Sequence, residues 1–435
     1  MRTIHEPARE TPVLDEVDVL VVGGGPAGYC AAVAAARQGA RTALVERYGC
    51  LGGLATGGLV LYMDGIFDTV GRRVMGGLVW ETMQRLEALG GLAQDSPTRL
   101  HVDSEWLQVA ADALCHEAGV QLWFHAWAVG AYLADGRVAG AILETKSGRQ
   151  AILARVCVDA TGDGDLAASA GAAYDMGHQR IGLNLKVGGV DRERWRAFTR
   201  DEPQRARALQ RAVLDEGGVL LRPNTTPHSD IGVYWINILG LDKRNGTTYH
   251  DEGDLHAMFE GQLSAVDVRD LSYVQYELRR RIARSLAFYK ANVPGFEDVR
   301  LLAIAPQLGV RESRRIRGMY ELTEADVRAQ RVFDDTIGLH GLGFAGGGLI
   351  HLPYRSLVPE TVDGLLTSGR CVSTDHWTMQ AVRLIPPAMV TGEAAGVAAA
   401  LSVQAGCQPR ALPTERLRGR LAETGVLMAG SEALA

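Results

Sequence analysis

DVLVVGGGPAGYCAAVAAARQGARTALVE, residues 18–46, holds the clearest structural pattern in this 435-residue chain. Its apolar start predicts a strand over 18–22, and after a glycine-rich turn an alanine-rich segment predicts a helix over 29–38. Gly39 ends that helix, and residues 42–46 predict a second strand. Strand, glycine turn, helix and strand within about thirty residues are typical of a unit that binds a dinucleotide.

Three glycines of the turn have the spacing that a bound pyrophosphate requires. Gly23 permits a tight turn, Gly25 lets the backbone approach the phosphates, and Gly28 allows the helix to pack closely on the strand. The phosphate oxygens would then face the positive N-terminal end of the helix. This context favours a nucleotide site over a plain glycine turn.

An acidic residue stands where the ribose of a dinucleotide is expected. Glu46 follows Gly28 by eighteen residues and ends the predicted second strand. Its carboxylate can accept hydrogen bonds from the ribose hydroxyls and would repel a 2′-phosphate. The sequence therefore disfavours NADP at this site.

The rest of the chain predicts a small β-meander beside this unit and a second domain inserted after it. Aromatic and charged residues become more frequent between residues 177 and 348, which marks the insertion. Hydrophobic periodicity predicts strands over 126–132, 138–144, 151–159 and 232–239, and helices over 272–289 and 392–405.

We therefore predict an α/β fold. It has a Rossmann-like nucleotide-binding domain with a mixed or parallel central sheet and a small β-meander, plus an inserted α+β substrate domain. The predicted boundaries are 16–176 for the first part of the nucleotide-binding domain, 177–348 for the substrate domain and 349–420 for the C-terminal return of the chain.

Composition argues against several classes of protein. The net charge is −6, from 45 basic and 51 acidic residues, so we expect no nucleic-acid partner. We expect no secretion signal, no membrane partner because no apolar run reaches ~20 residues, and a cytoplasmic location. The six cysteines lack CxxC spacing, so we expect no disulfide, no zinc and no bound metal: Cys30, Cys50, Cys115, Cys157, Cys371 and Cys407.

Three separated segments then resemble one family in the expected order. ERYGCLGGLATGG at 46–58 resembles the loop after the ribose carboxylate in FAD-binding Rossmann flavoproteins. DATGDGD at 159–165 resembles their returning segment, and GRC at 369–371 with GEAAG at 392–396 resembles their C-terminal flavin segment. The chain thus resembles the FAD-dependent oxidoreductase family, which is distantly similar to the flavoproteins of fumarate reductase and succinate dehydrogenase.

The resemblance implies FAD as the cofactor. It also implies that a helix N-terminus near the GEAAG segment faces the flavin ring. The residues implied in contact with FAD are Gly23, Gly25, Pro26, Ala27, Gly28, Glu46, Arg47, Gly52, Gly53, Leu54, Ala55, Thr56, Ala128, Val129, Ala160, Thr161, Gly162, Asp165, Gly369, Arg370, Pro387, Ala388, Gly392 and Ala395.

Candidate catalytic residues lie between the two C-terminal flavin segments. We expect His376 to act as an acid or base and Arg383 to hold an anion or oxyanion. The alternative for His376 is a histidine that only makes hydrogen bonds in a polar loop. Arg311 belongs to the charge run RESRR, which is either a solvated helix face or a buried ion-pair segment with Arg311 in the pocket.

A second group of candidates surrounds the glycine-rich segment 341–348. These are Tyr354 and Arg355, with His340 and His351 beside them. A plain glycine-rich loop explains this segment equally well. Cys50 has no second cysteine nearby, so we expect no redox-active disulfide.

The leading function is hydride transfer between FAD and a small polar substrate, such as a hydroxy acid, an amine or a polyol, with an electron acceptor or donor that the sequence does not identify. One alternative is a monooxygenase acting on an aromatic substrate, although residues 163–168 lack the serine and arginine expected for it. The other alternative is a non-catalytic electron-transfer subunit. A homo-oligomer and a covalent FAD link both remain open.

Overall fold

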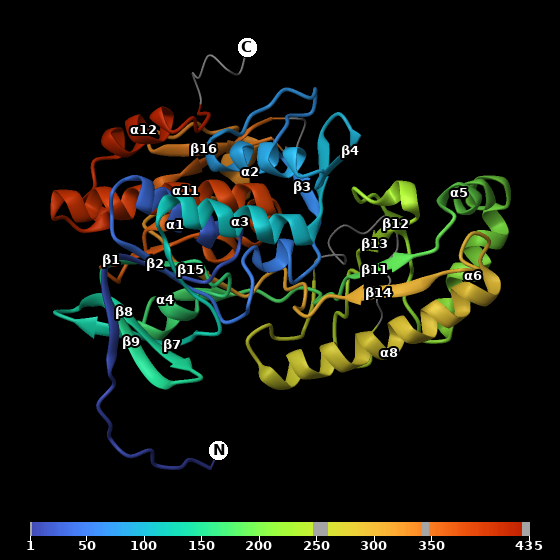
Figure 1. The fold of residues 1–435 in the computed structure, drawn as a ribbon, viewed down its shortest axis with the longest axis horizontal. Coiled ribbons are helices and arrows are strands. Elements are labelled where there is room, and N and C mark those ends of the chain that lie inside the picture. The colour runs from blue at the N-terminus through green and yellow to red at the C-terminus, as the bar shows by residue number, and fades with distance from the viewer. Residues whose placement is uncertain (1, 247–259, 342–347, 429–435) are drawn as a thin grey trace.

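The computed structural model describes residues 2–246, 260–341 and 348–428. Its largest sheet lies in the larger body at the left of Figure 1 and has the strand order β6-β2-β1-β9-β8-β7, with β18 also paired to β9. The strands are β1 (Val13–Val22), β2 (Thr42–Val45), β6 (Gln121–Trp123), β7 (Trp127–Ala134), β8 (Arg137–Thr145), β9 (Gly148–Asp159) and β18 (Leu365–Thr367).

The long strand β9 joins the parallel part of this sheet to the meander. Its first half pairs antiparallel with β8, and its last residues pair parallel with β18. A tight turn with positive φ at Asp135 and Gly136 connects β7 to β8. The predicted α/β class, the mixed sheet and the meander are confirmed. Because β1, β2, β9 and β18 run parallel, their carboxyl ends meet at one edge, which we call the strand-end edge.

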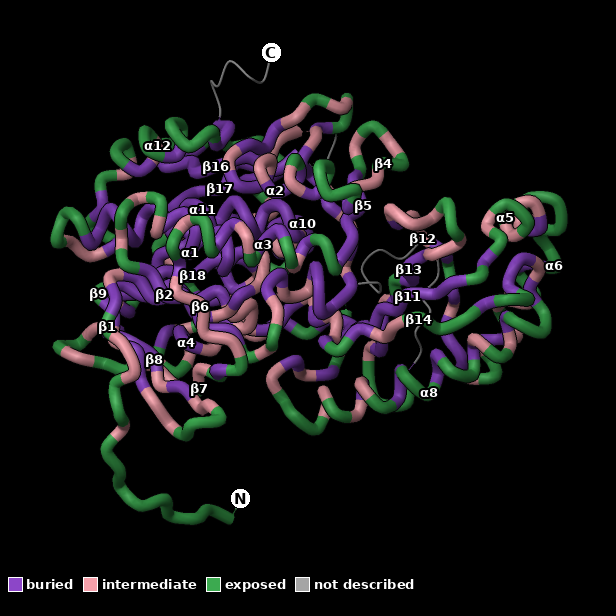
Figure 2. The backbone as a smooth tube through the Cα atoms, viewed as in Figure 1, coloured by how far each residue is buried: buried purple, intermediate pink, exposed green. Residues whose placement is uncertain are grey.

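Helices cover this sheet, and the region where they meet it is coloured as buried in Figure 2. The buried residues there form an apolar core. Helix α1 (Pro26–Arg37) packs along α11 (Ile385–Ala405), with α2 (Gly77–Ala88) and α3 (Ser104–Ala118) beside them. A Cβ on Gly392 or Gly396 would lie 2.1 Å from a backbone oxygen of α1. The two glycines therefore allow the helices to touch.

The expected start of the last long helix, at Gly392, is wrong. Helix α11 begins at Ile385, and the prolines that follow sit in its first turn, where a missing N–H costs nothing. It is long and apolar enough to cross a membrane by composition, yet 89% of its apolar window is buried inside the protein. Here it is the central helix of the core.

A second body, at the right of Figure 1, is built on the four-stranded sheet β12-β13-β11-β14. Helix α8 (Val268–Asn292) packs along this sheet. The apolar core of the second body is formed by residues between Ile181 and Val310, together with Leu59. The apolar residues that follow, Leu322 and Phe333 among them, belong to the first core again. The cores thus divide near Val310 rather than at residue 348, while the three-part domain division stays a prediction.

The remaining elements are short. They are η1 (Gly53–Ala55), β3 (Tyr62–Asp64), β4 (Leu92–Ser96), β5 (Arg99–Val102), α4 (Asp165–Ser169), β10 (Tyr174–Met176), β11 (Leu185–Gly188), α5 (Arg192–Asp201), α6 (Pro203–Asp215), β12 (Pro223–Asn224), η2 (Ser229–Ile231), β13 (Tyr234–Ile236), β14 (Arg300–Ile304), β15 (Arg314–Ile316), α9 (Glu324–Arg328), β16 (Thr336–His340), β17 (Ile350–Pro353), η3 (Tyr354–Leu357), η4 (Gly369–Cys371), α10 (His376–Val382), η5 (Pro409–Ala411) and α12 (Thr414–Glu423).

Candidate functional site

The glycine turn after β1 has the geometry that the sequence predicts. Gly23 has a φ of +98°, and a Cβ there would lie 2.6 Å from the carbonyl oxygen of Ala160. A Cβ on Gly28 would lie 1.7 Å from the oxygen of Gly23. At Gly25 the nearest protein atom would be 4.0 Å away. Protein packing thus requires the first and third glycines but not Gly25, which leaves room for a ligand to approach its backbone, as a pyrophosphate would.

Glu46 lies beside this turn, as predicted for a ribose partner. Its carboxylate accepts hydrogen bonds from the N–H of Gly24 at 2.6 Å and of Tyr48 at 2.8 Å. Burial raises the pKa of Glu46, and these backbone hydrogen bonds oppose the rise. Each oxygen keeps a second lone pair, so the group can still accept from a ribose.

Asp159, the last residue of β9, fixes the second loop of the edge. It is fully buried and accepts hydrogen bonds from Thr161 at 3.0 Å and 2.7 Å and from the N–H of Ala167 at 2.8 Å. Burial raises the pKa of Asp159 to about 6. Its carboxylate holds the turn in shape, and the residues expected to face FAD, Ala160 to Gly162, follow directly.

Asp163 and Asp165, at the end of this loop, bind residues from two distant segments. Asp163 accepts from Ser313 at 2.6 Å and from Arg370 at 2.8 Å, while Asp165 pairs with Arg314 at 2.8 Å. Burial would raise the pKa of Asp163, but Arg370 and these hydrogen bonds hold it below its ordinary value. Two arginines, Arg370 and Arg314, therefore hold this loop in place by ion pairs, and Arg370 lies beside Gly162.

The segment GVRESRR, residues 309–315, is not a solvated helix face. It is extended, leads into β15 and carries Glu312, which is 2% exposed. Arg311 donates to the carbonyl oxygens of Arg180 and Leu239 in the second body. Burial, and next the charge of Arg180, lower the pKa of Arg311 to about 10. We call residues 309–315 the bridging segment, because it contacts both bodies and the C-terminal return.

Within the bridging segment, Glu312 holds the predicted acid/base residue. His376 Nδ1 lies 2.7 Å from Glu312 Oε2, and Gln179 Nε2 donates to the same oxygen at 2.7 Å. Arg315 pairs with the other oxygen. The hydrogen bond to Glu312 raises the pKa of His376. Burial would raise the pKa of Glu312, but the bonds from His376 and Gln179 bring it below its ordinary value.

Arg383, at the end of α10, is close to this cluster and lacks an acidic contact of its own among the described residues. Its Nε is buried without a hydrogen-bond partner in the part of the chain that the structure describes. Burial, then the charges of Arg311 and Arg370, lower the pKa of Arg383 to about 9. Arg370 is already paired with Asp163, so Arg383 and Arg311 are the guanidinium groups here that lack an acidic contact among the described residues, and they favour an anion beside them.

Other predicted catalytic residues lie elsewhere. Tyr354 is buried in the main core and donates to the carbonyl oxygen of Pro409 at 3.0 Å, which argues against a catalytic role. Arg355 pairs with Asp335 at 2.9 Å. His340 and His351 are buried, and burial lowers the pKa of both. Most of the glycine-rich segment, 342–347, lies outside the described residues.

The predicted cofactor contacts divide into two groups. Pro387 and Ala388 occupy the first turn of α11, the helix end expected near a flavin. Gly392 and Ala395 lie in the interior of that helix, where Gly392 packs on Ala27 of α1, and both stay predictions as FAD contacts. The remaining predicted residues near the strand-end edge stay predictions as FAD contacts. They include the loop residues Arg47, Gly52, Gly53, Leu54, Ala55 and Thr56, the β7 residues Ala128 and Val129, and Gly369.

The residues of this network that are not among the predicted site residues are Gln179, Asp159, Asp163, Glu312, Arg315, Ser313 and Arg314. The last two lie within a motif whose polar side chains alternate in an extended segment, and Asp163 lies inside DATGDGD. Gln179 had no sequence signal, because a single glutamine in a mixed segment has no distinguishing pattern.

Comparison with known proteins identifies the family. The family model described as FAD dependent oxidoreductase matches residues 18–421. The chain belongs to the FAD-dependent oxidoreductase family. The predictions of FAD as cofactor and of an oxidoreductase are thereby confirmed, and the family is consistent with the open space at Gly25. When bound at the strand-end edge, FAD would be held by the glycine turn, Glu46 and the loop after β9.

Matches to individual proteins are local. Dihydrolipoyl dehydrogenase from Trypanosoma brucei brucei is 57% identical over 42 residues, 10% of this chain and 9% of that protein. The tRNA uridine 5-carboxymethylaminomethyl modification enzyme from Aquifex aeolicus (strain VF5) is 40% identical over 72 residues, 14% of this chain and 12% of that protein. These matches span about a tenth of the relatives' length.

Solved structures resemble the whole chain at low identity. p-Nitrophenol 4-monooxygenase from Pseudomonas putida DLL-E4 has a TM-score of 0.48 at 11% identity, covering 94% of this chain and 84% of that one. A geranylgeranyl bacteriochlorophyll reductase-like protein from Thermoplasma acidophilum has a TM-score of 0.45 at 15% identity, covering 95% and 84%.

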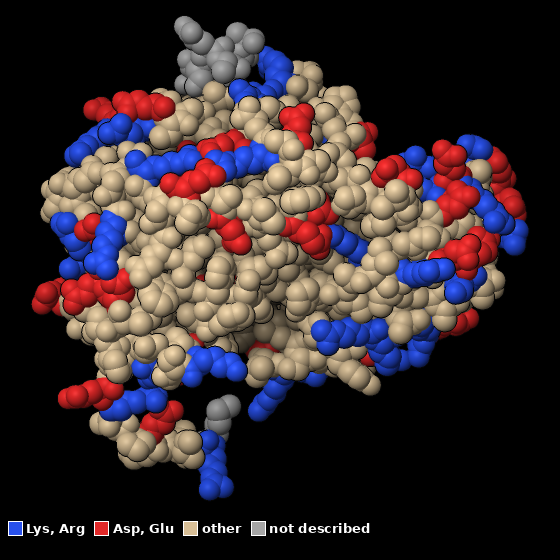
Figure 3. Space-filling view, viewed as in Figure 1, with Lys and Arg blue, Asp and Glu red and all other residues tan. Residues whose placement is uncertain are grey.

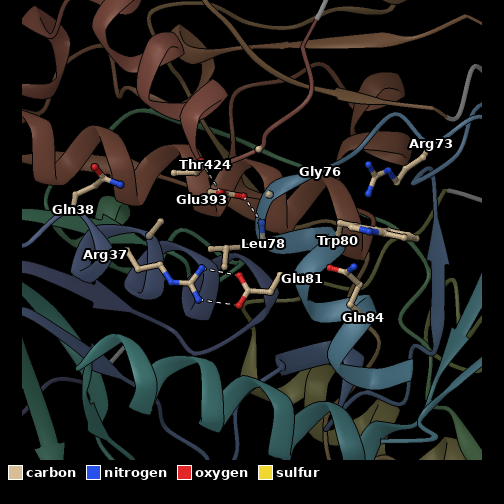
Figure 4. Close-up of a pocket in the computed structure, with 13 residues that line it drawn as sticks. Arg37, Gln38, Arg73, Gly76, Leu78, Trp80, Glu81, Gln84, Glu393 and Thr424 are labelled. Carbon is tan, nitrogen blue, oxygen red and sulfur yellow. Dashed lines mark hydrogen bonds and ion pairs between the residues drawn. The ribbon is translucent and has the colours of Figure 1, made fainter. Parts of the chain in front are cut away.

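A separate cavity of about 430 Å³ opens between α1, α2 and α11 (Figure 4). Glu393 lies at its floor and accepts from the N–H of Leu78 at 2.8 Å, while Arg37 and Glu81 pair at its side at 2.7 Å. Burial raises the pKa of Glu393 to about 7. On the face in Figure 3, acidic and basic side chains are mixed, and several basic side chains follow one another along its lower edge.

Proposed function

We propose that this protein transfers a hydride between FAD and a small polar substrate that carries an anionic or oxygen-rich group. The observation that carries the proposal is the pairing of two features near Arg370 and the DATGDGD loop. One is a histidine held by a buried carboxylate, and the other is a buried arginine, Arg383, without an acidic contact of its own.

His376 would move the proton that accompanies the hydride. Glu312 is hydrogen-bonded to the Nδ1 atom of His376. The His376 side chain is 48% exposed, so its Nε2 atom is free to face a substrate. Arg383, with Arg311 nearby, would bind the anionic group, because a buried cation gains most from a ligand of opposite charge. FAD, when bound, supplies the two-electron chemistry.

Anaerobic mixing of the FAD-loaded protein with a set of hydroxy acids, amines and polyols tests the proposal. We expect one chemical class to bleach the flavin absorption, with anionic members faster than their neutral amides or esters. Equal rates for charged and neutral members would contradict the role of the arginines. Bleaching by NADH or NADPH alone, stimulated by an aromatic compound, would instead support the monooxygenase alternative.

A further inference from the structure

Glu312 is the one acidic side chain in contact with the proposed acid/base residue in the part of the chain that the structure describes. We propose that Glu312 is a positioning residue, which fixes the proton of His376 on Nδ1 and stabilises the charged ring, so that Nε2 exchanges a proton with the substrate: it donates one when the substrate is reduced and accepts one when the substrate is oxidised. The catalytic consequence rests on the proposed function. The protonation state of His376 can be measured whether or not the proposed function is right.

Geometry fixes the carboxylate first. The Glu312 side chain is fully buried, and each of its oxygens is occupied: Oε2 by His376 and Gln179, and Oε1 by Arg315. A carboxylate with both oxygens held cannot rotate away from the ring. Arg315 is itself held, because its Nε donates to the carbonyl oxygen of Thr374 at 2.9 Å.

The ring is fixed from the other side by α10. His376 is the first residue of this helix, and the preceding Asp375 caps it by accepting from the N–H of Thr378 at 2.7 Å. Asp375 also accepts from the N–H of Glu324 at 2.7 Å, which ties the helix start to α9. The ring therefore presents Nδ1 to Glu312, and Nε2 has no hydrogen bond to a described residue.

The charges around His376 favour the imidazolium form. Glu312 and Arg315 face it from the bridging segment, Glu260 from the second body, and Asp375 from its own helix. Arg315 and the positive end of α10 oppose a charged ring. A charge-assisted hydrogen bond to a buried carboxylate outweighs both, because the end of a seven-residue helix has a weak field and Arg315 is already paired to the same carboxylate.

The substitution Glu312→Gln distinguishes the effect of the carboxylate charge on His376 from the effect of the side chain's shape. Glutamine has the same size and keeps a carbonyl oxygen that can accept from Nδ1, but it removes the negative charge. Glu393→Gln is the matched control, because Glu393 is a buried carboxylate bonded to Leu78 and Thr424 outside the site. Titration of the histidine ring signals by NMR, in FAD-loaded protein with labelled histidine, gives the pKa of His376, and His376→Ala assigns the signal.

We expect the pKa of His376 to fall by about one unit or more in Glu312→Gln and to stay unchanged in Glu393→Gln. An unchanged pKa in Glu312→Gln would overturn the inference. Should that variant not fold, the wild-type protein decides: a pKa of His376 at or below the ordinary ~6.5 overturns the inference, and a higher one with a slowly exchanging Nδ1 proton supports it.

The test does not depend on turnover. A shift in the pKa of His376 without any substrate that bleaches the flavin would leave the role of Glu312 intact and defeat the proposed function. A substrate that bleaches the flavin at equal rates in wild type and Glu312→Gln, with no shift in the pKa, would defeat the role of Glu312 alone.

Discussion

Ser313 Oγ donates a hydrogen bond of 2.6 Å to Asp163 Oδ1, across 150 residues of sequence. The bond joins the bridging segment to the loop that follows β9. Because the same segment carries Glu312 and Arg311, one short stretch links the expected cofactor loop, the candidate acid/base residue and the second body. Substitutions in the bridging segment should therefore affect both the binding of the cofactor and the reaction with the substrate.

Removal of this hydroxyl should weaken cofactor binding. In Ser313→Ala, Asp163 keeps Arg370 but loses a charge-assisted hydrogen bond, so we expect the dissociation constant for FAD to rise roughly tenfold, about 1.4 kcal/mol. Fluorescence titration of the apoprotein with FAD measures it. Ser285→Ala is the control, since that buried hydroxyl bonds to Val219 in the second body. Equal losses in both variants would point to a general loss of stability instead.

His376→Ala should slow substrate-dependent flavin reduction while FAD stays bound. Loss of an acid or base that contacts the substrate lowers the rate roughly 10²- to 10⁴-fold. Anaerobic stopped-flow absorption gives this rate once a substrate is found. The matched control is His228→Ala, because His228 also lies near a carboxylate, Asp103 at 3.3 Å, but outside the site. A rate equal to that of wild type would remove His376 from the mechanism.

The contact between α1 and α11 predicts a stability effect. A methyl group at Gly396 would lie 2.1 Å from the carbonyl oxygen of Ala31, so Gly396→Ala should lower the free energy of unfolding by about 1–3 kcal/mol. Gly419→Ala on α12 meets no atom within 4 Å and should be neutral or slightly stabilising. Urea unfolding of both variants tests the pair, and equal midpoints would contradict the close packing.

The raised pKa of Glu393 leads us to expect that the free energy of unfolding depends on pH. Burial raises its pKa from 4.5 to about 7, so the folded chain keeps a proton that the unfolded chain releases above pH 4.5. This contribution to stability is complete below pH 4.5 and is lost as the pH rises through 7, by roughly 3 kcal/mol in total. Glu393→Gln should remove that loss.

Urea unfolding between pH 5 and about 8 measures the effect. The exposed Glu87→Gln on α2 is the control and should keep the wild-type slope. A slope in Glu393→Gln as steep as that of wild type would assign the pH dependence to other groups.

The sequence predicts the first βαβ unit and the meander well, because their periodicity and turn residues act locally. The sequence places the start of α11 too late, because the prolines after Ile385 suggest a break, although the first turn of a helix tolerates them. Distant pairs leave no such local pattern: Glu312 with His376, and Ser313 with Asp163, meet only after the chain has crossed the second body. Tyr354 follows the glycine-rich segment in the sequence, which predicts a site residue. Its side chain is nevertheless buried in the main core of the structure.

The most direct test of the account is the FAD content of Gly25→Ala. A Cβ at this position would meet no protein atom closer than 4.0 Å and the backbone there is extended, with a φ of −66°, so the variant should fold like wild type. The added methyl group would occupy the space assigned to the pyrophosphate. After incubation with FAD and desalting, we expect flavin absorption in wild type and little or none in Gly25→Ala at unchanged thermal stability of the apoprotein. Equal flavin content in the two proteins would contradict the placement of FAD at the strand-end edge.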